Sequence, residues 1–269
     1  MIVIEPRHGW RELGIRELWE HRELLYFFVW RDLKVRYRQT FFGAAWAVLQ
    51  PFLLMIVFSV SVGRIPGIGP EGIPYPVFVF AGLVPWTLFA QGLAGASNSL
   101  VSGENIITKV YFPRLLLPSS AVASFLLDFA FGCGALALLM LLFGSALSST
   151  IVWAPLVALL AATTTLGIGV FLAAVNVRYR DVRYVVPFLV QLWLFASPIV
   201  YTSALVPDEW RLVYALNPMV GVVEAFRWSV FGGVLPVSEI AISVLTAGAI
   251  LAAALLYFRR VERTFADVI

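Results

Sequence analysis

The side chains that could do chemistry in this sequence are mostly basic, and many of them lie ahead of its first long apolar run. Arg36, Tyr37 and Arg38 close that charged stretch, and two guanidinium groups beside a phenol can donate several hydrogen bonds to a phosphate. We therefore predict that these three residues meet the anionic headgroup of a lipid, such as a pyrophosphate, at a cytoplasmic entrance. The alternative is an ordinary basic anchor at the membrane surface, without such a ligand.

The residue sets for ATP hydrolysis, metal binding and nucleophilic catalysis are missing. Neither of the two lysines, Lys34 and Lys109, follows a glycine, so there is no Gly-Lys-Ser/Thr phosphate loop. The two histidines, His8 and His21, lie in the charged first segment, and the single cysteine, Cys133, lies in an apolar run. A Ser-His-Asp site would lack a nearby base, and a Cys/His metal cluster lacks its ligands. We expect a protein that is not an enzyme and holds no metal or cofactor.

The composition indicates that the bilayer is the main solvent of this chain. Its 269 residues are 61% hydrophobic and 13% charged, whereas soluble proteins carry about 25% charged residues. A helix needs about 20 apolar residues to cross the hydrocarbon layer, and six runs have that character. They lie at about 43–63, 75–100, 115–143, 151–176, 184–206 and 237–258. We predict an all-α integral membrane protein with six transmembrane helices.

The basic residues predict how these helices are oriented. Of the 19 Lys and Arg residues, 16 lie before the first run, between the second and third, between the fourth and fifth, or after the sixth. The other three are Arg64, Arg211 and Arg227. Because loops rich in Lys and Arg stay in the cytoplasm, we predict that both termini are cytoplasmic. The cytoplasmic ends are then an N-terminal segment, 1–42, and a tail, 259–269.

The apolar stretch 208–236 is not predicted to cross the membrane. Asn217, Glu224 and Arg227 interrupt it, and a seventh crossing would move the basic residues of the tail to the outside. We predict an outer re-entrant hairpin of two short helices, in which Glu224 and Arg227, three residues apart, can pair. A long interfacial loop is the alternative.

The end of the N-terminal segment is predicted to form an interfacial helix. Tyr26 and Trp30 share one face, while Arg31, Lys34 and Arg38 share another. An aromatic face and a basic face suit the headgroup layer of a membrane.

A short cytoplasmic helix is predicted at 102–114, between the second and third spans. Ser102 can cap its first turn, and Pro113 must end it. Its apolar stripe consists of Ile106, Ile107, Val110 and Tyr111. Such a helix fits a groove in a partner protein or lies flat against the membrane.

Four segments of the chain resemble one known family. They are Arg36-Tyr-Arg-Gln-Thr-Phe-Phe-Gly-Ala-Ala-Trp46 with Gln50-Pro51, residues 104–114, residues 176–183, and Ser197-Pro-Ile-Val-Tyr201 with Asn217-Pro-Met219. In this order they are similar to the first-span, coupling, second cytoplasmic and late outer signatures of type-2 ABC transporter permeases that export polysaccharides. These permeases serve O-antigen, capsular polysaccharide and teichoic acid. The resemblance covers about residues 25–260.

The resemblance implies a homodimer that binds two copies of a separate ATPase subunit, to which ATP and Mg would bind. The substrate would be a lipid-linked polysaccharide, exported across the bacterial inner membrane, and no nucleic-acid partner is expected. The helix between spans two and three would carry the motion of the ATPase into the membrane. The coupling residues implied are Glu104, Asn105, Ile106, Ile107, Lys109, Val110, Tyr111, Phe112, Pro113 and Arg114.

The family's first and fifth spans line the path of the glycan. The lining residues implied here are Phe42, Trp46, Gln50, Leu53, Phe188, Gln191 and Phe195. Aromatic side chains suit sugars, although aromatic residues of membrane helices also face lipid. The resemblance further implies that the outer hairpin gates the exit, with Asn217, Glu224 and Arg227 as its polar residues.

Asp128, an acidic residue at mid-depth in the third span, has two interpretations. It is either the proton relay of an ATP-independent carrier or lipid flippase, or a hydrogen-bonded contact between helices. We favour the contact, because a lone carboxylate makes an incomplete relay. A membrane glycosyltransferase is a third class, but it needs clustered carboxylates for a metal-bound sugar nucleotide. Asp32, Glu104 and Asp181 are instead dispersed among basic residues.

Overall fold

The computed structural model describes residues 19–38, 43, 45–63, 65, 67–70, 72–110, 112–262 and 265, except the side chain of Asp208. Within this part of the chain the regular secondary structure is entirely helical. The predicted lining residue Phe42 and the predicted coupling residue Tyr111 lie outside the described residues. So do residues 1–18 of the predicted N-terminal segment and 266–269 of the predicted tail.

The order of helices follows the apolar runs of the sequence. The helices are α2 (Arg22–Arg38), α3 (Ala45–Ser61), α4 (Tyr75–Ser102), α5 (Glu104–Ile107), α6 (Leu116–Leu142), α7 (Ala154–Arg178), α8 (Val182–Phe195), α9 (Asp208–Ala215), α10 (Pro218–Phe231) and α11 (Val237–Val261). Short 3-10 turns, η2 (Ser149–Trp153) and η3 (Ser203–Leu205), precede α7 and α9.

Among the described residues, four helical segments are long and apolar enough to cross a membrane. They are Tyr75–Ser102, Leu116–Leu142, Ser149–Arg178 and Val237–Val261. The helices α3 and α8, of 17 and 14 residues, are apolar but shorter than the length of about 20 that a crossing needs. The predicted all-α membrane class is confirmed, and each of the six predicted runs contains an apolar helix.

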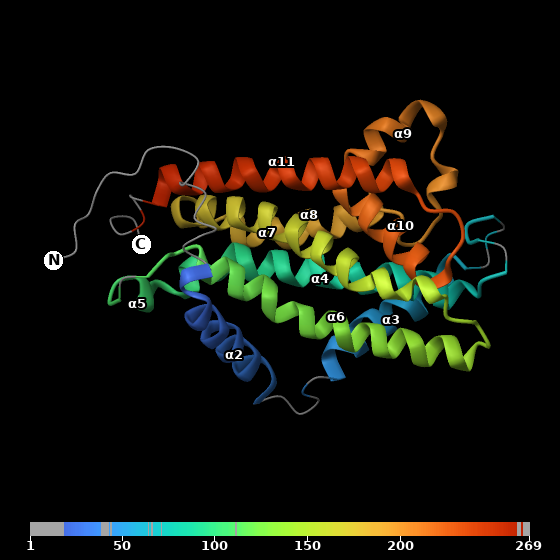
Figure 1. The fold of residues 1–269 in the computed structure, drawn as a ribbon, viewed down its shortest axis with the longest axis horizontal. Helices are drawn as coiled ribbons and strands as arrows, with labels where there is room; N and C mark the ends of the chain where they lie inside the picture. Colours follow the sequence, from blue (N-terminus) through green and yellow to red (C-terminus); the bar gives the residue numbers. More distant parts are fainter. Residues whose placement is uncertain are drawn as a thin grey trace.

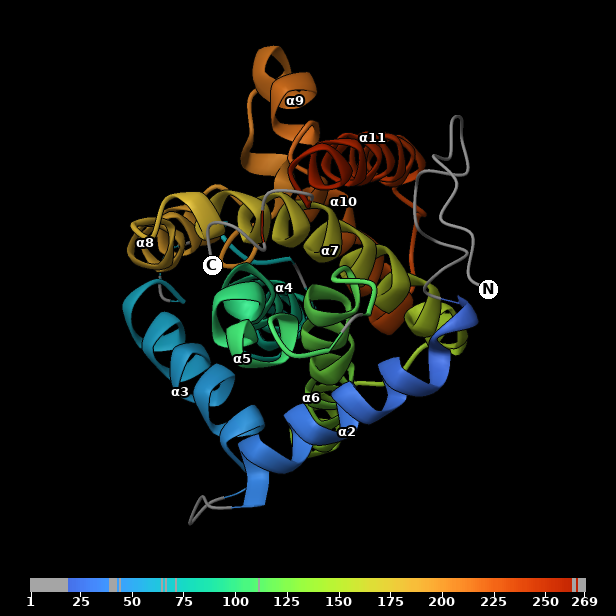
Figure 2. The same cartoon turned by 90° about the vertical axis from the view of Figure 1, so that its left-hand side faces the viewer.

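The helices form a bundle around α4. Figure 1 shows α4, α6, α7 and α11 side by side along the long axis of the molecule. In Figure 2, which looks along that axis, α4 is central and contacts α3, α6, α7, α8 and α10, while α11 packs outside on α7 and α10. Helix α5 lies at one end of the bundle, which we call the α5 end, and α9 stands out near the other end. Helix α2 runs obliquely near the α5 end and packs on α6.

Small residues allow α4 and α7 to approach closely. A Cβ atom added at Gly169 of α7 would lie 2.7 Å from the Cβ of Ala96 in α4. The Asn176 Nδ2 of α7 donates a hydrogen bond to the carbonyl oxygen of Ser97 in α4 (2.8 Å). Close backbone approach and interhelical hydrogen bonds are the main forces that hold helices together in lipid. The pair α4–α7 is therefore the rigid centre on which the other helices pack.

Helix α8 is shorter than predicted. It ends at Phe195, although the sequence predicted a span over 184–206. Pro198 lacks an N–H group and disfavours the helical conformation at Ser197, so the helix stops before them. The chain then follows an irregular path over 196–202 that is largely buried. The prediction of one continuous helix is wrong in its second half.

The stretch 208–236 contains the predicted pair of short helices, α9 and α10. The Asn217 side chain accepts a hydrogen bond from the Met219 N–H (3.0 Å), and Pro218 takes the first helical position. Gly232, with φ of +77°, ends α10 in the left-handed region that glycine adopts readily. α10 is buried against α4, α7 and α11, whereas α9 stands away from the bundle.

Candidate functional site

Helix α2 is joined to α6 by a row of polar contacts. The α6 residues Ser120, Ser124 and Asp128 recur at intervals of four, so they share one face of the helix. Asp32 of α2 accepts a hydrogen bond from the Ser120 Oγ (3.1 Å). One turn further on, Arg36 donates to the Ser124 Oγ (Nη2, 2.8 Å) and to the Asp128 carboxylate (Nη1 to Oδ2, 3.2 Å). These contacts determine which face of α2 meets the bundle.

The carboxylate of Asp128 is buried and fully engaged. Its side chain is 8% exposed, and the Tyr37 hydroxyl donates a second hydrogen bond to it. The Arg36 guanidinium also lies 3.6 Å from the centre of the Phe125 ring. Burial of the Tyr37 hydroxyl, its hydrogen bond to Asp128 and the negative charge of that carboxylate together raise the pKa of Tyr37 to about 12. The phenol therefore stays a donor at neutral pH. These contacts agree with the interpretation of Asp128 as a contact between helices.

The three residues predicted to bind a headgroup do not share one face of α2. Successive residues of a helix are separated by about 100°, which places Arg36 about 200° from both Lys34 and Arg38. Arg36 and Tyr37 therefore face α6, while Arg38 faces the opposite way. The structure does not bring Arg36, Tyr37 and Arg38 together around one ligand.

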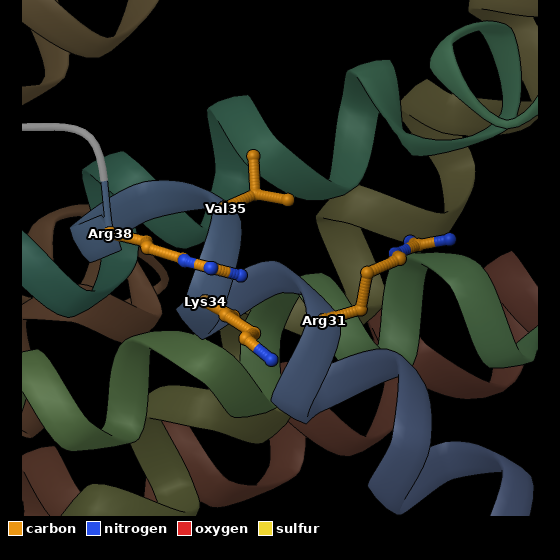
Figure 3. A pocket seen from close by; sticks show the side chains of 4 residues that line it. All are labelled: Arg31, Lys34, Val35 and Arg38. Carbon is orange, nitrogen blue, oxygen red and sulfur yellow. The ribbon is translucent and has the colours of Figure 1, made fainter.

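A basic groove lies on the face of α2 opposite Arg36. Arg31, Lys34, Val35 and Arg38 line an open pocket of about 260 Å³ there, and Figure 3 shows their side chains around it. Arg31 pairs with the neighbouring Asp32 at 2.8 Å, but Lys34 and Arg38 are exposed and have no ion pair within the described ranges of the chain. The predicted sharing of one face by the three basic residues is thus confirmed.

The basic groove does not lie at the extreme α5 end of the bundle but further along it. Asp128 lies twelve residues beyond Leu116, the first residue of α6, which corresponds to about 18 Å along the helix. Figure 1 shows α2 running obliquely from the α5 end towards the middle of α6, and the side chain of Arg36, in the last turn of α2, reaches Asp128. Exposed cations at that level of an apolar bundle need water or an anion as a partner. The groove is therefore the candidate anion site.

Helix α5 differs from the predicted helix over 102–114. It contains only Glu104–Ile107. The Ser102 hydroxyl does not cap it, but donates back to two carbonyl oxygens in the last turn of α4 (3.0 and 3.2 Å). Gly103 takes the cap position, where an added Cβ would lie 2.7 Å from the Leu117 side chain. The predicted cap and the predicted length are both wrong.

A buried apolar cluster, which we call the junction cluster, joins α5 to the other helices at the α5 end. Its members include Phe28, Leu100, Ile107, Phe112, Val177, Phe258 and Phe265. The rings of Phe28 and Phe112 meet edge to face, with 5.4 Å between their centres. Phe112 packs in this cluster, and Pro113 disfavours a helical conformation at Phe112, the residue before it. The chain therefore leaves the helix well before Pro113.

The described part of the predicted docking stripe is divided between the protein's own core and its surface. Ile107 and Phe112 are buried, and Ile106 is half-buried. Val110, by contrast, is 59% exposed. The exposed residues of the predicted coupling set are Glu104, Asn105, Lys109 and Val110. A partner at this end would meet those four residues and not Ile107, while Pro113 and Arg114 are half-buried behind them.

The six predicted lining residues that the structure describes are all on the surface of the chain. Trp46, Gln50 and Leu53 of α3 and Phe188, Gln191 and Phe195 of α8 are exposed. Figure 2 shows α3 and α8 on the same side of α4. The Gln50 Oε1 accepts a hydrogen bond from the Gln91 Nε2 of α4 (2.9 Å), which holds α3 to the bundle. In the described part of one chain these faces are open, so a closed path needs further protein.

The predicted outer-gate residues hold irregular backbone. Arg227 is 5% exposed, and its Nη2 donates to the carbonyl oxygen of Ile199 (2.7 Å). Its guanidinium carbon lies 3.6 Å from the centre of the Phe78 ring. The Glu224 carboxylate is 3.7 Å from the Arg227 Nη1, so the predicted pairing of these residues is confirmed.

Two further side chains satisfy carbonyl groups of the same stretch. The Asn217 Nδ2 donates to the carbonyl of Ala196 (3.0 Å), and the Tyr75 hydroxyl donates to that of Val200 (2.8 Å). Buried backbone outside a helix needs such partners. Tyr75 is not among the predicted site residues, although Pro198 inside a predicted span is a signal that freed carbonyl groups need donors.

A bundle of long apolar helices, with a basic groove on α2 and a short helix at one end, is the architecture of a multi-pass membrane protein. The chain matches the family described as ABC-2 type transporter over residues 23–231, and it belongs to that family.

Curated relatives agree with this assignment. The chain is 35% identical over 228 residues to the O-antigen export system permease protein RfbA of Myxococcus xanthus, covering 84% of this chain and 86% of that protein. It is 27% identical over 240 residues to an RfbA of Klebsiella pneumoniae, covering 89% and 92%. It is 25% identical over 213 residues to the polysialic acid transport protein KpsM of Escherichia coli, covering 76% and 79%. The resemblance seen in the motifs is confirmed.

Proposed function

We propose that this chain is the permease subunit of an ABC exporter that carries lipid-linked polysaccharide, of the O-antigen, capsule or teichoic acid type, across the inner membrane. ATP hydrolysis in a separate subunit drives the export. The names of the relatives and the lack of a phosphate loop in the sequence support this proposal. The structural observation that carries it is the basic groove, which offers the exposed cations Lys34 and Arg38 at a depth that a lipid-bound phosphate can reach.

The headgroup site of this proposal is the basic groove. Lys34 and Arg38, with Arg31 beside them, receive the phosphate groups of the lipid carrier, because exposed guanidinium and ammonium groups bind phosphate strongly. Arg36 and Tyr37 serve the site indirectly. Through Asp128 they hold α2 in the rotation that presents the groove.

The proposed topology has six crossings and cytoplasmic termini. Helix α8 is continued across the outer half of the bilayer by the irregular stretch 196–202. Irregular backbone is tolerated at membrane depth where protein satisfies it, and Arg227, Asn217 and Tyr75 supply donors for it. The helices α9 and α10 form the outer re-entrant hairpin, and these same donors act at the outer gate.

The working unit is proposed to be a homodimer with two ATPase subunits. The open faces of α3 and α8 from two copies enclose the glycan path, with exposed Trp46, Phe188 and Phe195 among its lining residues. ATP and Mg²⁺ bind to the ATPase subunits. The exposed face of the α5 segment contacts the ATPase, and the buried side of that segment passes its movement to the junction cluster.

The test is co-purification of the tagged chain from its host in mild detergent. The variant carries Lys109→Glu and Val110→Asp, both exposed positions. Arg260→Glu is the matched control, because Arg260 is exposed and belongs to the last turn of α11, which ends at the α5 end. We expect a stoichiometric subunit with a Walker phosphate loop, lost in the double variant and kept in the control.

Absence of such a subunit from the wild-type preparation would contradict the proposal. The ATP-independent carrier would then be the better explanation. It predicts transport driven by a proton gradient and abolished in Asp128→Asn.

A further inference from the structure

Phe265, four residues beyond the end of α11, is a member of the junction cluster. Phe265 is completely buried, and its ring packs edge to face on Phe258 at 5.4 Å between centres. Helix α11 itself packs mainly on α7 and α10. Phe265 and Phe258, the latter in the last turns of α11, therefore belong to the same apolar cluster as Ile107 of α5.

Arg114 makes a second connection between the coupling segment and this C-terminal part. Its guanidinium donates a hydrogen bond to the backbone carbonyl of Glu262 and lies 5.9 Å from the centre of the Phe265 ring. The last carbonyl groups of a helix lack partners within the helix, so Arg114 satisfies a group that the end of α11 leaves open. The Glu262 carboxylate also pairs with Arg259 (3.1 Å). Arg114, predicted to belong to the coupling set, thus binds within its own chain.

The coupling segment has an exposed side and a buried side with different partners. Val110 and Lys109 are open to a partner, while Ile107 is enclosed by the junction cluster. Close-packed protein interiors are nearly incompressible, so a displacement of the exposed side must move the groups behind it. Those groups include Phe265 and the end of α11. A cavity at Phe265 would absorb part of the displacement.

We propose that Phe265 and Glu262, together with Arg114, are positioning residues for energy coupling. They hold the coupling segment against the end of α11, so that movement of the ATPase reaches the membrane helices. The inference rests on the proposed function, because it requires an ATPase docked on the α5 segment. The three residues act after docking, since they lie behind the surface that meets the partner.

The experiment measures transport per ATP hydrolysed in inverted membrane vesicles from the host. The probe is the host's own lipid-linked polysaccharide, labelled with radioactive sugar. For Phe265→Ala we expect the ATPase to remain bound, while transport per ATP falls by about threefold or more. Phe265→Leu keeps the apolar volume and restores most of the ratio. Phe80→Ala is the control, because Phe80 is equally buried but lies in α4, in a separate cluster.

The outcomes separate this inference from a purely structural role and from the proposed function. The control is expected to lower the unfolding temperature without changing transport per ATP. The same behaviour in Phe265→Ala would overturn the inference. If Phe265→Ala does not fold, Arg114→Met removes the donor to the Glu262 carbonyl and leaves the apolar cluster intact, and an unchanged ratio in that variant would overturn the inference equally. A wild-type chain without a bound ATPase would instead defeat the proposed function before any variant is compared.

Discussion

The contact between Arg36 and Asp128 should contribute measurably to stability. Breaking a buried ion pair by removing one partner costs about 3–5 kcal/mol. The Arg36 side chain is 28% exposed, so water compensates part of that loss. Asp128→Ala also removes the acceptor for the Tyr37 hydroxyl, worth about 1 kcal/mol. We therefore expect Asp128→Ala to lower the free energy of unfolding by about 2–3 kcal/mol.

The assay is a double-mutant cycle on the purified chain in detergent, followed by denaturant unfolding. The variants are Asp128→Ala, Arg36→Gln and the two combined, and contacting residues in one network are expected to couple by about 1–2 kcal/mol. Ser124→Ala is the matched control, because it removes one hydrogen bond to Arg36 without a change of charge. Its effect should not exceed about 1 kcal/mol.

Strictly additive effects of the two single substitutions would refute this reasoning, because they would show that Arg36 and Asp128 do not interact. ATP-driven transport should also survive Asp128→Asn, since the amide still accepts a hydrogen bond from Tyr37. Loss of transport in a well-folded Asp128→Asn protein would point back to a titrating carboxylate.

Three further predictions test other parts of the structure. Ile107→Asp should destabilise the chain by about 3 kcal/mol or more, because it buries a charge. At the exposed position, Val110→Asp should change the free energy of unfolding by about 0.5 kcal/mol at most. Equal unfolding temperatures of the two variants would contradict this. Gly169→Leu should cost about 2 kcal/mol or more in denaturant unfolding, because even its Cβ would lie 2.7 Å from that of Ala96; a neutral effect would argue against the close α4–α7 contact. Because the pKa of Tyr37 is raised from 10.0 to about 12, its stabilising bond is fully present below pH 10 and is lost as the pH rises to 12. The difference in unfolding temperature between wild type and Tyr37→Phe should vanish over that interval, and a constant difference would count against the bond.

Properties that depend on residues close together in the sequence could be predicted from the sequence alone. The length and hydrophobicity of a run are local, so α4, α6, α7 and α11 lie close to their predicted positions. The break near Asn217-Pro218 predicted two short helices, and the spacing of Glu224 and Arg227 predicted their pairing, because residues three apart are neighbours on a helix. The family motifs were likewise contiguous and needed no tertiary information.

Properties that depend on which helix packs against which were decided only by the tertiary structure. Arg36 and Asp128 are 92 residues apart, and no local pattern shows that they meet. Helical periodicity placed Ile107 on an apolar stripe, but an apolar stripe serves a partner and the protein's own core equally well. Packing assigned Ile107 to the core and left Val110 outside. The sequence determines the kind of surface that each helix offers, whereas the choice of its neighbour follows from burying all those surfaces at once.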